Sequence, residues 1–115
     1  MADSALFLGW NRSVAGRERQ AMDLFMKVVE YYGQLQNDGK IESFEPVLLA
    51  AHGGDLNGFV LIRGEADKLD EIRREEKFIN YSIEAGFCLG GFGVMRGYLG
   101  DNITETFSQW SKHIS

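Results

Sequence analysis

The sequence has little of several residue types that mark common classes of protein. A single cysteine among 115 residues, Cys88, excludes an internal disulfide and favours a reducing, cytoplasmic setting. No stretch approaches the roughly 20 apolar residues of a membrane helix, and the apolar run near the N-terminus is too short for a signal peptide. Positive charge is also scarce, because 12 Lys and Arg against 17 Asp and Glu give a net charge of −5. We therefore expect no nucleic-acid partner and no membrane partner.

Metal-binding and phosphate-binding motifs are missing as well. Two histidines and one cysteine lie far apart in the sequence, so no metal site has a recognisable spacing. The segments "GGDLNG" and "GGFG" are rich in glycine, but neither matches a P-loop. We expect no metal and no cofactor. No catalytic motif is present, so the sequence leaves open whether the protein is an enzyme.

The composition is that of one globular domain, with 44% hydrophobic and 25% charged residues. We predict a single domain over 1–115, with a core over 4–100 and a C-terminal helix over 101–115. Short apolar runs bounded by turn residues predict four strands, which we expect over residues 5–10, 41–52, 59–64 and 87–100. The second of them contains Pro46, which cannot donate a ladder hydrogen bond and therefore favours an edge position or a bulge.

Two longer segments repeat apolar residues every three or four positions, as amphipathic helices do. The first begins at Arg17 and ends before Gly39, which suits a left-handed helix cap. Its periodicity directs Tyr32 inward and Tyr31 toward solvent or an interface. The second covers 65–86, and a break near Arg74 and Glu75 is expected within it because Glu76 falls on its apolar stripe. Its inward stripe is predicted to consist of Leu69, Ile72, Ile79 and Ile83.

The order β-α-β-β-α-β predicts an α+β fold: a four-stranded antiparallel sheet with both main helices on one face. The other face should then meet water, so polarity should alternate along each strand. It does not, because residues 5–8, 47–51 and 59–62 are apolar without interruption. Large bare apolar patches are avoided in soluble proteins. We therefore predict a homodimer formed by sheet-to-sheet packing. The alternative is that the C-terminal helix covers part of the bare face of its own chain.

Several segments resemble the dimeric α/β-barrel superfamily, whose members have a ferredoxin-like fold. "VAGRERQAMDLF" is similar to the start of the group's first helix, although Ala15 stands where a proline is usual. "DKLDEIRREEKF", "GFGVMRGYLG" and "IESFEPVLLAAHGGDLNGFVLIRG" are similar to its second helix, its last strand and the hairpin of an uncharacterised branch. The resemblance implies a dimeric α/β barrel. The superfamily includes antibiotic-biosynthesis monooxygenases, isomerases and proteins that only bind ligands, so it implies no single activity.

Three residues are candidates for binding a small organic ligand. His52 follows the second strand beside Asp55, where it is a weak candidate for acid–base catalysis or a turn residue whose ring bonds the local backbone. Arg63 shares a strand face with apolar residues, so it holds an anionic or carbonyl group or forms an ion pair, for instance with Glu45. Trp10 lines a pocket or packs on a helix. Cys88 is expected to be a buried, unreactive thiol.

These observations predict an uncharacterised homodimer that binds a small molecule. One alternative is a cofactor-independent oxygenase or isomerase acting on a small organic substrate. The other is an RNA-recognition-like module, because "LFLGWN" and "NGFVLI" resemble ribonucleoprotein motifs and Phe7 and Phe59 would then stack on bases. The acidic composition and Leu61, where an aromatic residue is preferred, weigh against RNA.

Overall fold

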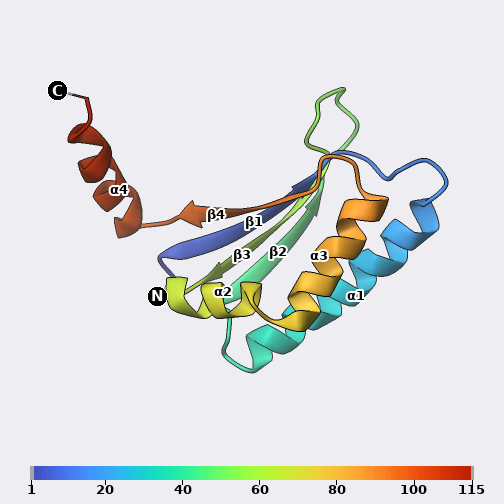
Figure 1. The fold of residues 1–115 in the computed structure, drawn as a ribbon, viewed down its shortest axis with the longest axis horizontal. Helices are drawn as coiled ribbons and strands as arrows, with labels where there is room; N and C mark the ends of the chain where they lie inside the picture. The colour runs from blue at the N-terminus through green and yellow to red at the C-terminus, as the bar shows by residue number, and fades with distance from the viewer. Residues whose placement is uncertain (1, 115) are drawn as a thin grey trace.

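The computed structural model describes residues 2–114, which form a four-stranded antiparallel sheet and four helices (Figure 1). The strands run across the sheet in the order β2-β3-β1-β4. In chain order the elements are β1 (Ser4–Trp10), α1 (Glu18–Asn37), β2 (Ser43–Leu48), β3 (Gly58–Gly64), α2 (Ala66–Arg73), α3 (Glu76–Cys88), β4 (Gly93–Tyr98) and α4 (Asp101–Ser111). The predicted α+β fold and strand–helix order are confirmed.

The two faces of the sheet have different surroundings. Helices α1, α2 and α3 lie over one of them (Figure 1), which we call the covered face; it is formed by Leu6, Leu8, Trp10, Val60 and Ile62 among others. Alternate residues of the same strands form the opposite side, which we call the open face; it includes Phe7, Val47, Phe59, Leu61 and Met95. Burial in β3 alternates accordingly, because every second residue from Gly58 is buried and those between are half-buried.

Local chemistry explains where α1 ends. Gly39 has a φ of 74°, a left-handed conformation that glycine adopts without steric cost. The amide of Gly39 donates to the carbonyl of Gln36, and the amide of Lys40 donates to the carbonyl of Leu35. This pair of bonds is the Schellman pattern, which satisfies the last helical carbonyls and turns the chain toward β2. The cap predicted at Gly39 is confirmed.

The expected break in the second helical segment is also confirmed, at Arg74 and Glu75. Glu75 connects this break to α1, because the Tyr31 hydroxyl donates to Glu75 Oε1 at 2.8 Å. It also contacts the turn after α1, where Lys40 Nζ lies 3.5 Å from Glu75 Oε2. Tyr31 is therefore buried and not at the surface as predicted, whereas Tyr32 is buried as predicted. Burial is the main cause that raises the Tyr31 pKa, and the hydrogen bond to Glu75 adds to it.

The break changes which residues of α3 face inward. Leu69 and Ile72 of α2 are buried as predicted, but Ile79 and Ile83 are exposed. The angular register of a helix restarts after a break, so α3 presents Phe78, Ala85 and Cys88 to the core instead. The prediction for Ile79 and Ile83 was wrong because it continued one stripe across two helices.

Two strands are shorter than predicted. The strand expected over 41–52 ends at Leu48, and residues 49–57 form a loop that projects from the sheet (Figure 1). The strand expected over 87–100 begins only at Gly93, because Phe87 and Cys88 belong to α3. Strand β2 lies at an edge of the sheet, which is the position that Pro46 predicted.

Helix α4 does not cover the open face of its own sheet. It continues beyond β4, away from α1 and α3 (Figure 1), and none of its residues is buried. Within residues 2–114, no helix is long and apolar enough to cross a membrane.

Candidate functional site

A cavity of about 470 Å³ lies between the covered face and the helices above it. Leu8 and Val60 contribute its floor on the sheet. Phe25 of α1 and Ala85 of α3 contribute its walls, and Phe92 adds an aromatic ring from the segment before β4. Cavities of this size with apolar and aromatic linings are typical of small-molecule sites.

Trp10 is an aromatic wall of this cavity, and a glycine makes its position possible. Trp10 lies directly opposite Gly58 on the neighbouring strand. A Cβ atom at position 58 would lie 2.6 Å from Cζ2 of the indole, which is closer than real Cβ contacts allow. The indole then meets the Phe25 ring edge-on, with ring centroids 6.2 Å apart. The local pairing of Trp10 with Gly58 therefore fixes one side of the cavity.

The polar groups that line the cavity are uncharged. Tyr32, Tyr81, Ser13 and Ser82 provide hydroxyls, and no residue of the lining is charged at neutral pH. Burial is the main cause that raises the Tyr32 pKa, and Tyr81 contributes less. The Tyr32 phenol therefore stays protonated at physiological pH. A ligand would meet mostly carbon atoms and a few groups able to donate or accept a hydrogen bond.

Three exposed side chains mark where the cavity reaches solvent. Met22 and Met26 of α1 are 63% and 67% exposed, and Leu48 at the end of β2 is 68% exposed, yet all three belong to the lining. The mouth therefore lies between α1 and the edge strand β2. Methionine is unbranched and adapts its shape, so it tolerates ligands of different outline.

Of the three binding residues predicted from the sequence, the cavity lining includes Trp10 and neither His52 nor Arg63. Trp10 also packs on α1 through Phe25, so this residue both lines the cavity and contacts a helix.

His52 lies in the loop over 49–57, and the local backbone holds its ring. The Gly54 amide donates to His52 Nδ1 at 3.1 Å, so that nitrogen is the acceptor. His52 Nε2 lies 2.8 Å from the Leu56 carbonyl, to which it donates in this tautomer. Both ring nitrogens are therefore engaged within the loop, which matches the turn role weighed for this residue. Asp55, also in this loop, is exposed, and neither of these bonds involves it.

Arg63 points to the open face, where it forms an ion pair with Glu45 of β2. This is the pair that the sequence suggested as one of two roles. The Arg63 side chain is 33% exposed and that of Glu45 is 56% exposed, so water screens the pair strongly. It borders an otherwise apolar surface.

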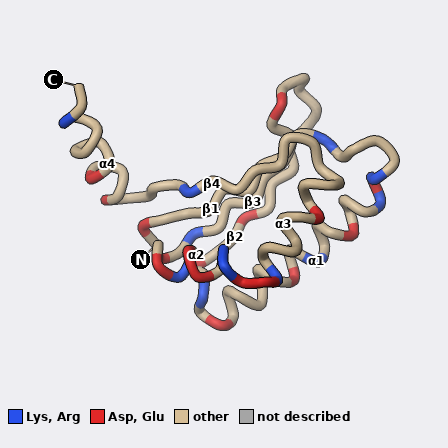
Figure 2. The backbone as a smooth tube through the Cα atoms, viewed as in Figure 1, with Lys and Arg blue, Asp and Glu red and all other residues tan. Residues whose placement is uncertain are grey.

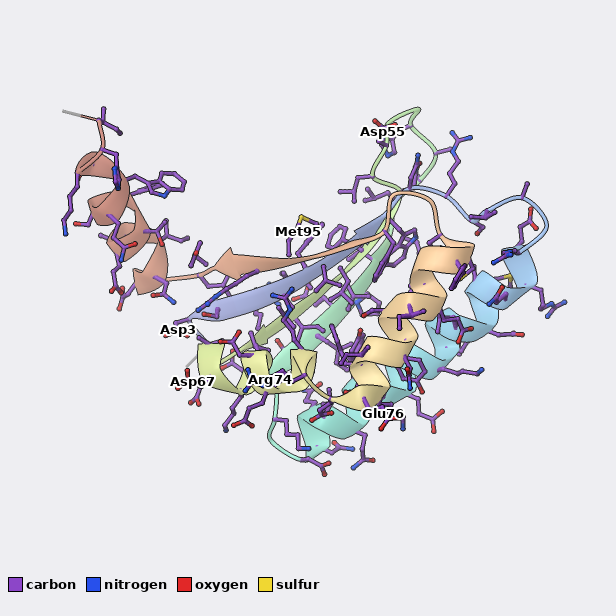
Figure 3. The ribbon with its side chains drawn as sticks, viewed as in Figure 1. Asp3, Asp55, Asp67, Arg74, Glu76 and Met95 are labelled. Atoms are coloured by element: carbon purple, nitrogen blue, oxygen red, sulfur yellow. The ribbon has the colours of Figure 1, made fainter. Side chains whose placement is uncertain are left out.

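The open face is largely apolar. Phe7 of β1 and Phe59 of β3 stack with ring centroids 5.0 Å apart and 25° between their planes. Gly9 lies beneath Phe7, because a Cβ atom there would be 2.7 Å from the Phe7 ring. Met95 is half-exposed beside them and points away from the helices (Figure 3). Charged residues are concentrated on the helices and loops and are few along the strands (Figure 2).

Sequence reasoning missed Tyr81 and Phe92, and it assigned Phe25 to the core only. These residues come from three parts of the chain and meet only in the folded structure. The helical stripe of α1 indicated that Phe25 faces inward, but no sequence pattern shows that its ring borders a cavity.

Other chemically active groups do not form a site within residues 2–114. No cluster of three or more His, Cys, Asp or Glu side chains among them could hold a metal ion. Cys88 is fully buried, as predicted. Burial is the main cause that raises the pKa of its thiol, and the negative charge of Glu84 adds to it. The protonated thiol is a poor nucleophile.

Comparison with known proteins identifies the fold. The sequence matches no family model, and no curated protein matches it significantly. Among solved structures, the chain is similar to a dimeric protein of unknown function and ferredoxin-like fold from Bacteroides fragilis, with a TM-score of 0.60 and 8% sequence identity. The chain has a ferredoxin-like fold. The match covers 84% of this chain and 96% of the other, so the two chains share nearly the whole ferredoxin-like core. At this identity the likeness extends to the fold alone.

Proposed function

We propose that this ferredoxin-like protein is a homodimer that binds small, uncharged, mainly apolar molecules between its sheet and its helices. One observation carries the proposal: a cavity of about 470 Å³ with aromatic walls and no charged lining residue. Ligand sites commonly combine such walls with a few polar groups that fix orientation.

The lining determines the class of ligand. A charged group inside this cavity would lose its hydration without gaining a partner of opposite charge, which is strongly unfavourable. A single hydroxyl, carbonyl or ring nitrogen is acceptable, because the hydroxyls of Tyr32 and Ser82 can hydrogen-bond to it. Planar ligands suit the space beside Trp10 and Phe25, where aromatic rings stack or meet edge-on.

Binding is tested with the neutral fluorophore N-phenylnaphthylamine as the probe. Ser82→Phe fills part of the cavity, and Asn80→Phe adds the same ring at an exposed position of the same helix. We expect Ser82→Phe to weaken probe binding at least about tenfold and Asn80→Phe to leave it within about twofold, because only the former removes space.

Backbone amide chemical shifts, measured by NMR, locate the bound probe. On addition of the probe, they are expected to change for the lining residues Leu8, Ala85 and Phe92. Shifts confined to open-face residues such as Leu61, or equal binding by the two variants, would overturn the cavity assignment.

The homodimer forms through the open faces of two sheets. Phe7, Phe59 and Leu61 would leave an apolar patch in water in a single chain, and such patches mark interaction sites. The solved neighbour is described as dimeric. An isologous pair is also the commonest oligomer.

Sedimentation of Met95→Glu tests this interface, with Arg96→Glu as the control. Met95 is half-exposed on the open face, whereas the adjacent Arg96 points to the other side of the same strand. We expect wild type and Arg96→Glu to be dimers and Met95→Glu to be a monomer, because charge on the open face would be buried without a partner. A monomeric wild type at micromolar concentration would refute the dimer.

We further propose that the chain is related to the dimeric α/β-barrel superfamily and resides in the cytoplasm, where its single thiol stays reduced. Binding is favoured over oxygenase or isomerase chemistry, because the groups that line the cavity are hydroxyls and His52 is held by its own loop. RNA binding would need Phe7 and Phe59 to be free, and sheet-to-sheet packing would cover both.

A further inference from the structure

Helix α4 has an apolar side that the rest of residues 2–114 leaves largely exposed. Ile103, Phe107 and Trp110 recur at spacings of four and three, so they share one side of the helix. They are 42%, 57% and 57% exposed. The rings of Phe107 and Trp110 lie 5.3 Å apart and form one continuous aromatic surface. The remaining positions, such as Glu105 and Ser108, are polar.

The helix stands out from the rest of the molecule as an arm. It rises from the end of β4 toward the side to which Met95 points, which is the side of the open face (Figures 1 and 3). The radius of gyration is 15.5 Å, whereas a compact domain of this length has about 13.4 Å. The accessible surface is 7454 Å², about 1,100 Å² more than the size scaling gives for 12.9 kDa.

Hydrogen bonds hold the base of the arm against the start of β1. Asn102 Nδ2 donates to the Asp3 carbonyl at 2.8 Å, and the Leu99 amide donates to the same carbonyl at 3.1 Å. The side chain of Asn102 forms this attachment and does not cap the helix. These bonds attach the base of the arm to the start of β1 in the orientation that Figure 1 shows.

We propose that α4 is an exchanged arm: in the homodimer proposed above, on which this inference rests, its apolar side packs against the open-face side of the second copy. The arm rises on the side of the open face (Figures 1 and 3), so a partner sheet placed on that face lies on the same side as the arm. The excess surface of about 1,100 Å² is similar to the roughly 800 Å² that each partner buries in a standard interface. By symmetry each copy gives one arm and receives one.

The charge of the arm fits a second copy better than a membrane. Helices that lie on lipid surfaces carry many Lys and Arg residues on their polar side. Helix α4 contains two acidic residues, Asp101 and Glu105, and no Lys or Arg within its bounds. An apolar aromatic stripe beside a polar, mildly acidic side suits the margin of a protein interface, where apolar contacts meet a polar rim.

Trp110→Glu and Ser108→Glu test the arm as a matched pair. Each adds one negative charge to α4, but the first lies on the apolar side and the second on the polar side. By sedimentation equilibrium we expect Trp110→Glu to raise the dimer dissociation constant at least about tenfold, because buried tryptophans dominate interface energetics. Ser108→Glu should change it less than about threefold.

A second measurement locates the contact directly. In a mixture of isotope-labelled and unlabelled chains, filtered nuclear Overhauser spectra should show contacts between Ile103 methyls of one copy and the Met95 methyl of the other. Contacts within one chain only would overturn the exchanged arm.

The outcomes separate this inference from the proposed dimer. A dimer that Met95→Glu dissociates and Trp110→Glu leaves intact would refute the arm and keep the sheet interface. A monomeric wild type would refute both. Ligand binding in the cavity is independent of either result.

Discussion

The covered and open faces of the sheet are built from the same strands but differ in their exposure to solvent. Val60 and Leu61 are neighbours in β3, and each pairs with an apolar residue of β1. Val60 is 2% exposed beneath the helices, whereas Leu61 is only half-buried on the opposite side. Hydrophobicity alone therefore does not distinguish a core position from an interface position in this sheet. The placement of the helices decides it.

Each face also places an aromatic ring over a glycine, with opposite results. On the covered face, Trp10 lies over Gly58 and becomes the wall of a cavity. On the open face, Phe7 lies over Gly9 and stacks with Phe59. A glycine under an aromatic ring thus helps to form a cavity on one side of the sheet and a stacked aromatic pair on the other.

Val60→Glu should have the largest effect, because it places a carboxylate in the core of the covered face. An unpaired buried charge costs about 3–5 kcal/mol or more, a large part of the stability of a small domain. We expect loss of the folded state, measured as loss of near-ultraviolet circular dichroism at 25 °C. A native-like spectrum with an unchanged urea midpoint would contradict the assignment of this face to the core.

Leu61→Glu, one residue further along, should leave the chain folded and separate the dimer. The carboxylate can reach water in a single chain but not between two sheets. We expect a monomer by sedimentation velocity, with a far-ultraviolet spectrum like that of wild type. If Leu61→Glu unfolds the chain as completely as Val60→Glu does, Leu61 is as essential to the core as Val60, and the distinction between the two faces is wrong.

Gly58→Ala and Gly9→Ala should each reduce stability by about 1–3 kcal/mol, because each added methyl group collides with an aromatic ring. Their functional effects should differ. Gly58→Ala displaces Trp10 and weakens binding of N-phenylnaphthylamine, whereas Gly9→Ala displaces Phe7 and weakens the dimer. Urea unfolding, probe titration and sedimentation measure the three quantities. The same functional loss in both variants would contradict the division between the faces.

Tyr32→Phe should have the smallest effect, seen only at alkaline pH. Burial raises the pKa of Tyr32 in the folded state above its ordinary value near 10. The unfolded chain therefore releases the phenol proton first, and stability falls as pH rises above 10. The loss is about 0.8 kcal/mol at pH 10.5 for one such group. Urea unfolding between pH 8 and 11 should show a shallower decline for Tyr32→Phe. Equal slopes for wild type and Tyr32→Phe would refute this.

The succession of strands and helices along the chain, the long first helix and the broken second helix could be predicted from sequence because each leaves a local pattern. Apolar runs marked the strands, Gly39 marked a cap, and Glu76 on an otherwise apolar stripe marked the break. The inward face of α3 could not be predicted, because Ile79 and Ile83 matched a register that the break had reset. Tyr31 is buried because its hydroxyl meets Glu75, which is 44 positions away in the chain.

The candidate site was predictable only in part. Trp10 could be proposed because a large aromatic residue at a strand end is a common pocket wall. The cavity itself depends on the space between Trp10, Phe25 and Phe92. The periodicity of apolar residues predicts which side chains face inward, but it does not predict which interior space is left unfilled. His52 and Arg63 attracted attention as isolated polar residues, yet their partners, the Leu56 carbonyl and Glu45, lie within their own loop and sheet.

Pro46 limits how far copies of this chain can associate. It sits within β2 at one margin of the sheet and supplies no amide proton, so a strand arriving at that margin finds a gap in the row of donors. The opposite margin, β4, leads directly into α4. Growth into fibrils by adding strand after strand is therefore opposed at Pro46, whereas the face-to-face pairing proposed above does not use this margin.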